Sequence, residues 1–181
     1  MTTRIRAFVA VELPEPGRRL LADHLRECAG VAPGYRWVAP DSLHLTLRFL
    51  GWLEPEQLAL TRARLSEVRA PAFRLGLDGR GAFGPRAAPR VVWLGAAEGV
   101  AACAALAVAV DGACRAAGAE PDPRPFQAHV TLARQRTERE RLPTLPDVPA
   151  LTPWTVAEFV LFESRLQQQP RYVPLGRFPL L

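Results

Sequence analysis

One short pattern, His-apolar-Thr-apolar, occurs twice in the chain and contains the side chains best suited to catalysis. It begins at His44, with Thr46 two residues later, and again at His129, with Thr131 two residues later. In an extended strand, alternate side chains share a face. Each copy is therefore expected to present an imidazole and a hydroxyl side by side on the open face of a strand, with apolar neighbours buried behind them.

Two histidines on opposite sides of a cleft can act as an acid–base pair. A neutral imidazole takes a proton from water and a protonated one gives a proton to a leaving oxygen, and an unperturbed pKa of about 6.5 suits both tasks. Such a pair fits in-line displacement at phosphorus, with the two threonine hydroxyls donating to the non-bridging oxygens. The third histidine, His24, lies beside an apolar helical stripe, which predicts a core residue.

An arginine could assist at the phosphate, and two are candidates. Arg48 shares the face of His44 by strict alternation. Arg134 lies five residues after His129, so it reaches the cleft only if its strand bends or ends before it. The same alternation predicts that Phe49 is buried behind the first strand.

Other catalytic classes find no support in the sequence. It contains no cluster of residues at metal-ligand spacing, no GxSxG elbow and no GxxxxGK[ST] phosphate loop. We therefore expect no metal and no cofactor. The three cysteines, Cys28, Cys103 and Cys114, form no CxxC pair and are expected to be small buried residues.

The charged residues favour an anionic partner. The formal net charge is +5, and all 23 basic residues are arginine, whose planar fork can bind two phosphate oxygens at once. A basic surface suits RNA, although an ordinary solvated surface would have the same composition. No secretory signal and no apolar run of membrane-spanning length are found, which predicts a cytoplasmic protein that does not bind a membrane.

Strands and helices alternate along the chain and must position the two motifs. The expected strands cover residues 4–12, 43–51, 72–77, 90–95, 128–134, 154–164 and 171–178. The expected helices cover 17–29, the segment from Glu54 to Pro71, and 98–117, with loops at 79–89 and 135–153. One motif lies in each half, 85 positions apart (129 − 44), which suggests an internal duplication.

The motifs and their surroundings resemble the two-histidine phosphoesterase superfamily. The resemblance is greatest to the bacterial and archaeal RNA 2′,3′-cyclic phosphodiesterases, also called 2′-5′ RNA ligase-like proteins. Besides the two motifs, it includes residues 6–10, 36–38, 92–95, 124–126, 161–164, 172 and 177–180. It implies one domain over residues 1–181 with a bilobal α+β fold. Its two pseudo-symmetric lobes would each hold an antiparallel sheet flanked by helices, with the active-site cleft between them.

The resemblance also implies an activity, which is metal-independent hydrolysis of an RNA terminal 2′,3′-cyclic phosphate to a 2′-phosphate. His44 would be the proton donor to the 3′-oxygen, and His129 the proton acceptor that activates water. A family arginine matches Arg134 rather than Arg48. The substrate-binding residues would then be Thr46, Thr131 and Arg134.

The implied partner is an RNA with a 2′,3′-cyclic phosphate end, for example a tRNA fragment, bound by a monomer. Two alternatives remain open. One is a 2′-5′ RNA ligase, which runs the same chemistry in reverse, and the other is a non-catalytic module that binds RNA ends. Phe49, Trp37 or Phe126 could stack on a base, or each could belong to the core.

Overall fold

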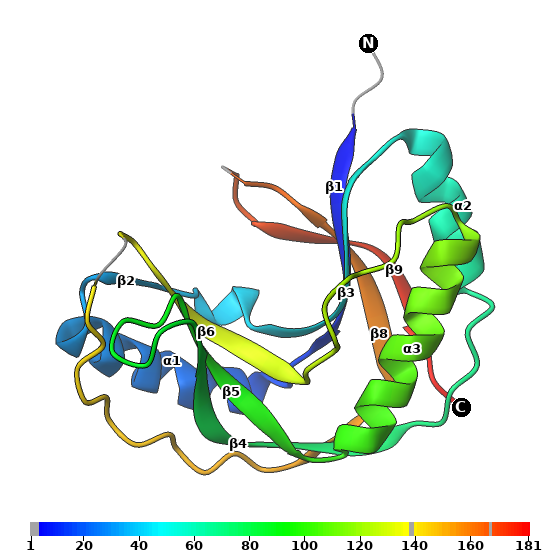
Figure 1. Cartoon of the computed structure of the whole chain (residues 1–181). Coiled ribbons are helices and arrows are strands. Elements are labelled where there is room, and N and C mark those ends of the chain that lie inside the picture. Colours follow the sequence, from blue (N-terminus) through cyan, green and yellow to red (C-terminus); the bar gives the residue numbers. More distant parts are fainter. Residues whose placement is uncertain (1–3, 138–139, 167) are drawn as a thin grey trace.

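One curled antiparallel sheet carries both motifs (Figure 1). The computed structural model describes residues 4–137, 140–166 and 168–181. The strands are β1 (Ile5–Glu12), β2 (Tyr35–Trp37), β3 (His44–Leu53), β4 (Phe73–Phe83), β5 (Val91–Glu98), β6 (His129–Gln135), β7 (Trp154–Val156), β8 (Glu158–Ser164) and β9 (Tyr172–Pro179). The helices are α1 (Glu15–Val31), α2 (Pro55–Leu65) and α3 (Val100–Ala116), with a 3₁₀ turn η1 (Pro40–Ser42).

The sheet consists of two halves that meet at the motif strands. The strand order is β7-β4-β5-β6-β3-β1-β8-β9, and β2 pairs with the last residues of β6, from Ala133 to Gln135. The halves join where β3 pairs with β6 through Leu45 and Val130. The predicted α+β fold with two lobes is therefore confirmed, and the two His-Thr strands occupy the centre of the sheet.

The helices cover only one face of this sheet. The main core joins leucines of α1 and α3, such as Leu21 and Leu106, to the inward side chains of both central strands, such as Leu45 and Val130. In Figure 1, α1 lies beside the β4–β6 half, and α2 and α3 lie beside the half formed by β3, β8 and β9. The opposite face of β1 and β8 carries a separate cluster without helical residues, centred on Phe8. That face is left open for the site.

Each motif strand contains a β-bulge at the third residue after its histidine. The pairing of β1 with β3 skips Leu47, and the pairing of β5 with β6 skips Leu132. A bulge puts two successive residues on one face and reverses the alternation beyond it. In β3, Leu47 and Arg48 therefore both point toward the helices.

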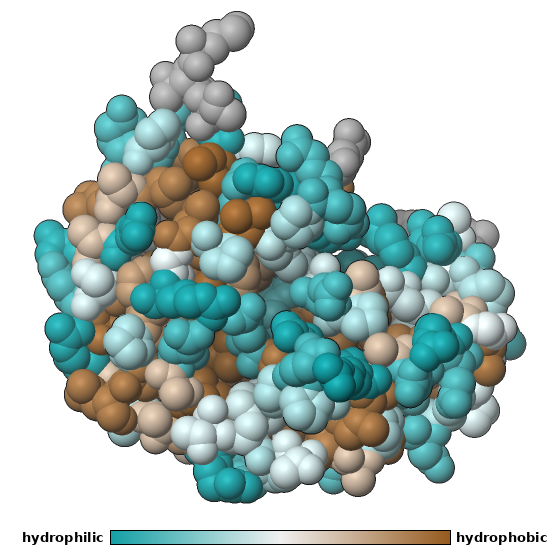
Figure 2. Space-filling view, turned by 180° about the vertical axis from the view of Figure 1, so that it is seen from behind, coloured by the Kyte–Doolittle hydropathy of each residue, from teal (hydrophilic) through white to brown (hydrophobic). Residues whose placement is uncertain are grey.

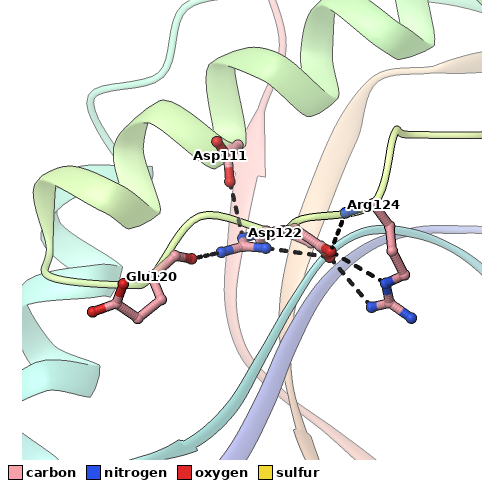
Figure 3. A network of polar contacts seen from close by, with 5 residues as sticks. Asp111, Glu120, Asp122 and Arg124 are labelled. Atoms are coloured by element: carbon pink, nitrogen blue, oxygen red, sulfur yellow. Dashed lines mark hydrogen bonds and ion pairs between the residues drawn. The ribbon is translucent and has the colours of Figure 1, made fainter.

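The prediction that Arg48 lies beside His44 is wrong for this reason. Arg48 is only 6% exposed, and its Nε and Nη1 atoms lie 3.0 Å from Asp111 and 3.3 Å from Asp122. It also donates to the backbone carbonyl of Glu120. These acceptors come from α3 and from the segment that leads toward β6 (Figure 3). Arg48 thus ties two segments of the second half of the chain to the back of β3.

Phe49 is the second residue displaced by the bulge. The sequence predicted that it is buried, but it is 38% exposed and lies on the open face. Its ring is stacked 6.4 Å from that of Phe8, and the guanidinium of Arg6 lies 4.4 Å above it. The chain therefore places an aromatic ring where strict alternation would have placed a cation.

Several boundaries differ from the prediction. The first helix includes Gly30 and continues to Val31. The second ends at Leu65 instead of continuing to Pro71. The backbone N–H of Ser66 donates to the carbonyl of Arg62 in the last regular turn, and that of Val68 donates to the carbonyl of Leu65 in a tighter one. Strand β4 extends to residue 83 and shortens the expected 79–89 loop. The expected strand at 154–164 is divided into β7 and β8, which pair with different neighbours.

Other sequence predictions concern the core and the surface. His24 is 4% exposed, and its Nε2 lies 3.5 Å from the sulfur of Cys28, so its prediction as a core residue is confirmed. The cysteines Cys28, Cys103 and Cys114 are free and buried, as predicted. Among the described residues, no helix is both long and apolar enough to cross a membrane.

We predict that Arg48→Ala destabilises the fold strongly. It would leave Asp111 and Asp122 without their shared cation, and breaking such a buried ion pair costs about 2 to 4 kcal/mol. Urea unfolding followed by circular dichroism measures the loss. The control is Arg74→Ala, whose exposed pair with Glu98 should contribute no more than about 1 kcal/mol. Equal losses in both variants would contradict a structural role for the buried network.

Candidate active site

The four motif side chains meet on the open face at the junction of the two halves. Leu45 and Val130 are paired and fully buried. Extending this antiparallel register by one residue in each direction places His44 opposite Thr131 and Thr46 opposite His129. The imidazoles therefore occupy diagonal corners of a square, and the hydroxyls occupy the other two corners. The two histidines come from separate lobes, as the sequence predicted.

Both imidazoles are held by the same backbone contact. His44 Nδ1 lies 2.8 Å from the carbonyl oxygen of Ser42, and His129 Nδ1 lies 2.7 Å from that of Gln127. In each case the acceptor is two residues before the histidine. A carbonyl can only accept, so Nδ1 carries a proton in both rings and Nε2 remains for the substrate. The site thus presents two equivalent imidazole nitrogens.

Aromatic rings flank each histidine. The ring of His44 lies 4.8 Å from that of Phe8 and 5.1 Å from that of Tyr172, which meets it edge-on. The ring of His129 is met edge-on by Phe83 at 5.1 Å, and Trp93 lies 5.9 Å away. These contacts fix the ring orientations and remove water from their sides.

A glycine makes room for one of these aromatic rings. Trp93 lies across Gly81, its partner in the neighbouring strand, where an added Cβ would be only 2.1 Å from the indole. Any larger residue at position 81 would therefore displace the ring that supports His129. From the sequence, Gly81 was expected only as part of the 79–89 loop.

Burial keeps both histidines neutral in the absence of an anion. The pKa of His44 is lowered to about 4, mainly by desolvation and also by the charges of Arg134, His129 and Arg171, whereas the bond to Ser42 raises it. Desolvation also lowers the pKa of His129, with the charge of Arg134 acting in the same direction. An anion between the rings would oppose all of these effects and raise both pKa values.

The bulge in β6 brings Arg134 to the open face. Because Leu132 is skipped, Arg134 lies on the same face as His129 despite its odd offset. The sequence predicted that Arg134 would reach the cleft only if its strand bends or ends before it, and the bulge is such a bend. Burial lowers the pKa of Arg134, and the charges of Arg36 and Arg171 lower it as well, against the effect of Tyr172. A cluster of three arginines therefore lies beside the two histidines.

Two openings of different size lie near the sheet. A cavity of about 200 Å³ borders His44 and is lined by residues that include Asp41, Phe162 and Tyr172. A larger groove of about 1000 Å³ lies between α2 and β9, and neither histidine lines it. The face seen in Figure 2 is hollowed near its middle, with hydrophilic residues around the hollow. Only the smaller cavity adjoins the paired imidazoles.

Several side chains at the site were not predicted as site residues. Phe8, Trp93 and Tyr172 lie in expected strands, and Phe83 lies in the expected 79–89 loop. Their contacts with the histidines depend on strand order, which the sequence does not show. Arg36 and Arg171 are two of many arginines. Among the proposed stacking residues, Trp37 donates to the carbonyl of Ala32, and both Trp37 and Phe126 pack against the core. In the part of the chain that the structure describes, no group of three or more His, Cys, Asp or Glu residues could hold a metal ion.

Comparison with known proteins places this site in a family. The chain matches the family described as LigT like Phosphoesterase over residues 11–93 and 94–172, one match for each half. The chain therefore belongs to the LigT-like phosphoesterase family. The division of the matches agrees with the two-lobed arrangement of the sheet.

Named relatives are similar over most of the chain. The RNA 2′,3′-cyclic phosphodiesterase of Escherichia coli is 33% identical over 97% of this chain and 96% of its own length. That of Geobacillus stearothermophilus is 34% identical over 96% of this chain, which spans only 57% of that relative's length. Among solved structures, E. coli LigT complexed with 3′-AMP has a TM-score of 0.83 at 32% identity, covering 98% of this chain and 99% of that one.

We predict that His44 titrates far below an ordinary histidine. Without an anion it should be neutral above about pH 4 and become protonated below it, because burial and nearby arginines disfavour the imidazolium. Imidazole NMR signals followed against pH, assigned with His44→Gln and His129→Gln, measure both midpoints. Added inorganic phosphate should raise them. A midpoint for His44 at or above about 6.5 without an anion would contradict this account.

Proposed function

We propose that this protein is a phosphodiesterase that opens RNA terminal 2′,3′-cyclic phosphates by hydrolysis to 2′-phosphates. The observation that supports it most is the pair of equivalent imidazoles, each with Nδ1 held by a carbonyl, which leaves Nε2 for proton transfer. Hydrolysis of a cyclic phosphodiester needs one base and one acid on opposite sides of phosphorus. The names of relatives from Escherichia coli and Geobacillus stearothermophilus point to the same reaction.

In the proposed reaction, the two histidines exchange protons with opposite ends of the displacement. The Nε2 of His129 takes a proton from water, and the resulting hydroxide oxygen forms a bond to phosphorus. The bond between phosphorus and the 3′-oxygen breaks as His44 gives its Nε2 proton to that oxygen. The products are a 2′-phosphate and a free 3′-hydroxyl, and proton exchange with solvent restores the starting state.

The substrate itself supplies the charge that this mechanism needs. His44 must be protonated to act as the acid, yet burial holds its pKa near 4 in the empty site. The phosphate anion favours the imidazolium form and raises this pKa on binding. Thr46 and Thr131 donate to the non-bridging oxygens, and Arg134 balances their growing charge.

A single copy of the chain would suffice for this function. Both histidines, both threonines and Arg134 come from β3 and β6 of one chain, so we propose a monomer. Its substrate would be an RNA end such as that of a tRNA fragment, and it would act in the cytoplasm as one two-lobed domain.

The first test is hydrolysis of a nucleoside 2′,3′-cyclic phosphate in excess EDTA. The 2′-phosphate should be the only product, and His44→Ala or His129→Ala should each lower the rate by about 100-fold or more. The two products are separated by chromatography.

Outcomes of this test also address the alternatives. If wild-type protein binds RNA with a cyclic phosphate end but never turns it over, the non-catalytic module is correct instead. Joining of that end to an RNA with a 5′-hydroxyl, without hydrolysis, would favour the ligase.

A second test separates the threonines from the histidines. Thr46→Ala and Thr131→Ala should each lower kcat by about 10- to 100-fold, because a hydroxyl donor to the developing charge is lost. The matched control is Thr155→Ala, an exposed threonine of strand β7 that is remote in the sheet order from β3. An unchanged kcat in both motif variants would contradict their role at the phosphate.

A further inference from the structure

The arginines of the site are arranged asymmetrically about the two histidines. Arg36 pairs directly with Arg134 across β2 and β6, so their side chains share the open face. The guanidinium of Arg171 lies 5.7 Å from the ring of Tyr172, which itself meets His44 edge-on. Arg134 and Arg171 act on the pKa of His44, whereas only Arg134 acts on that of His129. The positive charge therefore concentrates on the His44 side.

This cluster is costly for the empty protein. Like charges directly opposite one another in a sheet destabilise the pairing of Arg36 with Arg134. Within the described residues, none of the three arginines forms an ion pair, although ten other arginines do. The Nε of Arg171 is also buried there without a hydrogen-bond partner. An anion on this side would satisfy all three groups.

The chemistry of the reaction identifies which part of the substrate reaches this side. In an in-line displacement, the attacking water and the leaving oxygen lie on opposite sides of phosphorus. With His129 at the water, the leaving 3′-oxygen and its ribose lie toward His44. The same ribose carries the 5′ phosphodiester that continues the RNA chain. The only other phosphate near the reacting one therefore extends toward the arginines.

We propose that Arg36 and Arg171 form a subsite for the phosphodiester immediately 5′ to the cyclic end, while Arg134 remains at the reacting phosphate. This inference rests on the proposed function and deepens it. It makes the preferred substrate an oligonucleotide end rather than a free nucleoside cyclic phosphate. Two arginines give this subsite charge-assisted bonds to a group that takes no part in the chemistry.

The test compares two substrates that differ only upstream of the reacting group. Wild-type kcat/KM should be about tenfold or more higher for a dinucleotide with a 2′,3′-cyclic phosphate end than for the mononucleotide. Arg36→Ala and Arg171→Ala should each lower the ratio of the dinucleotide kcat/KM to the mononucleotide kcat/KM by about tenfold. The matched control is Arg19→Ala, an exposed arginine of α1 paired with Glu15, which should alter neither rate.

A substrate with an uncharged internal linkage tests the effect of the upstream charge alone. A dinucleotide whose internal linkage is an uncharged methylphosphonate should lose the wild-type preference, and the two arginine variants should no longer matter for it. If the variants slow mononucleotide and dinucleotide equally, or if wild-type protein does not distinguish the charged from the neutral linkage, the subsite is wrong although the phosphodiesterase stands. If wild-type protein hydrolyses none of the three substrates, the proposed function fails and the subsite fails with it.

Discussion

The pairing of Leu45 with Val130 is the contact on which the whole site depends. It joins the two halves of the sheet, and its register decides that each histidine lies opposite a threonine of the other strand. A shift of one residue would turn both motifs toward the helices. The fully buried side chains of Leu45 and Val130 prevent that shift, because it would expose them and bury two imidazoles. Hydrophobic burial behind the sheet thus fixes the polar geometry in front of it.

The two bulges then determine what surrounds that square. They occur at equivalent positions, Leu47 and Leu132, and so bring the fifth residue after each histidine to the open face. In one strand that residue is Phe49 and in the other it is Arg134, so equivalent backbones carry unlike side chains. Behind the first bulge, the turned Arg48 becomes the anchor of α3 and of the segment before β6. The two lobes thus share a backbone geometry but place an aromatic ring on one side of the site and a cation on the other.

The sequence predicted most of the strands, the three helices and the two-lobed fold, because periodicity and repetition are local signals, but it missed the short strand β2. It could not predict the exchange of Arg48 and Phe49. A bulge is often marked by glycine, but here the skipped residues are leucines that also suit a regular strand. Nor could it predict the aromatic rings beside the histidines, since Tyr172 meets His44 only through the order of β3, β1, β8 and β9. Resemblance to a family indicated Arg134 as the substrate-binding arginine, whereas alternation alone allowed it to reach the cleft only if its strand bends or ends before it.

The charge on the histidines differs between the empty site and the site with a bound phosphate. Desolvation and nearby arginines keep the pKa of both imidazoles low, so the empty site holds its positive charge on guanidinium groups alone. A bound phosphate reverses the balance, since it compensates the arginines and favours a proton on His44. The acid is then created by the substrate that requires it. Two half-buried histidines, beside arginines that form no ion pair with any described residue, therefore form a site in which His44 gains its proton only when an anion is present.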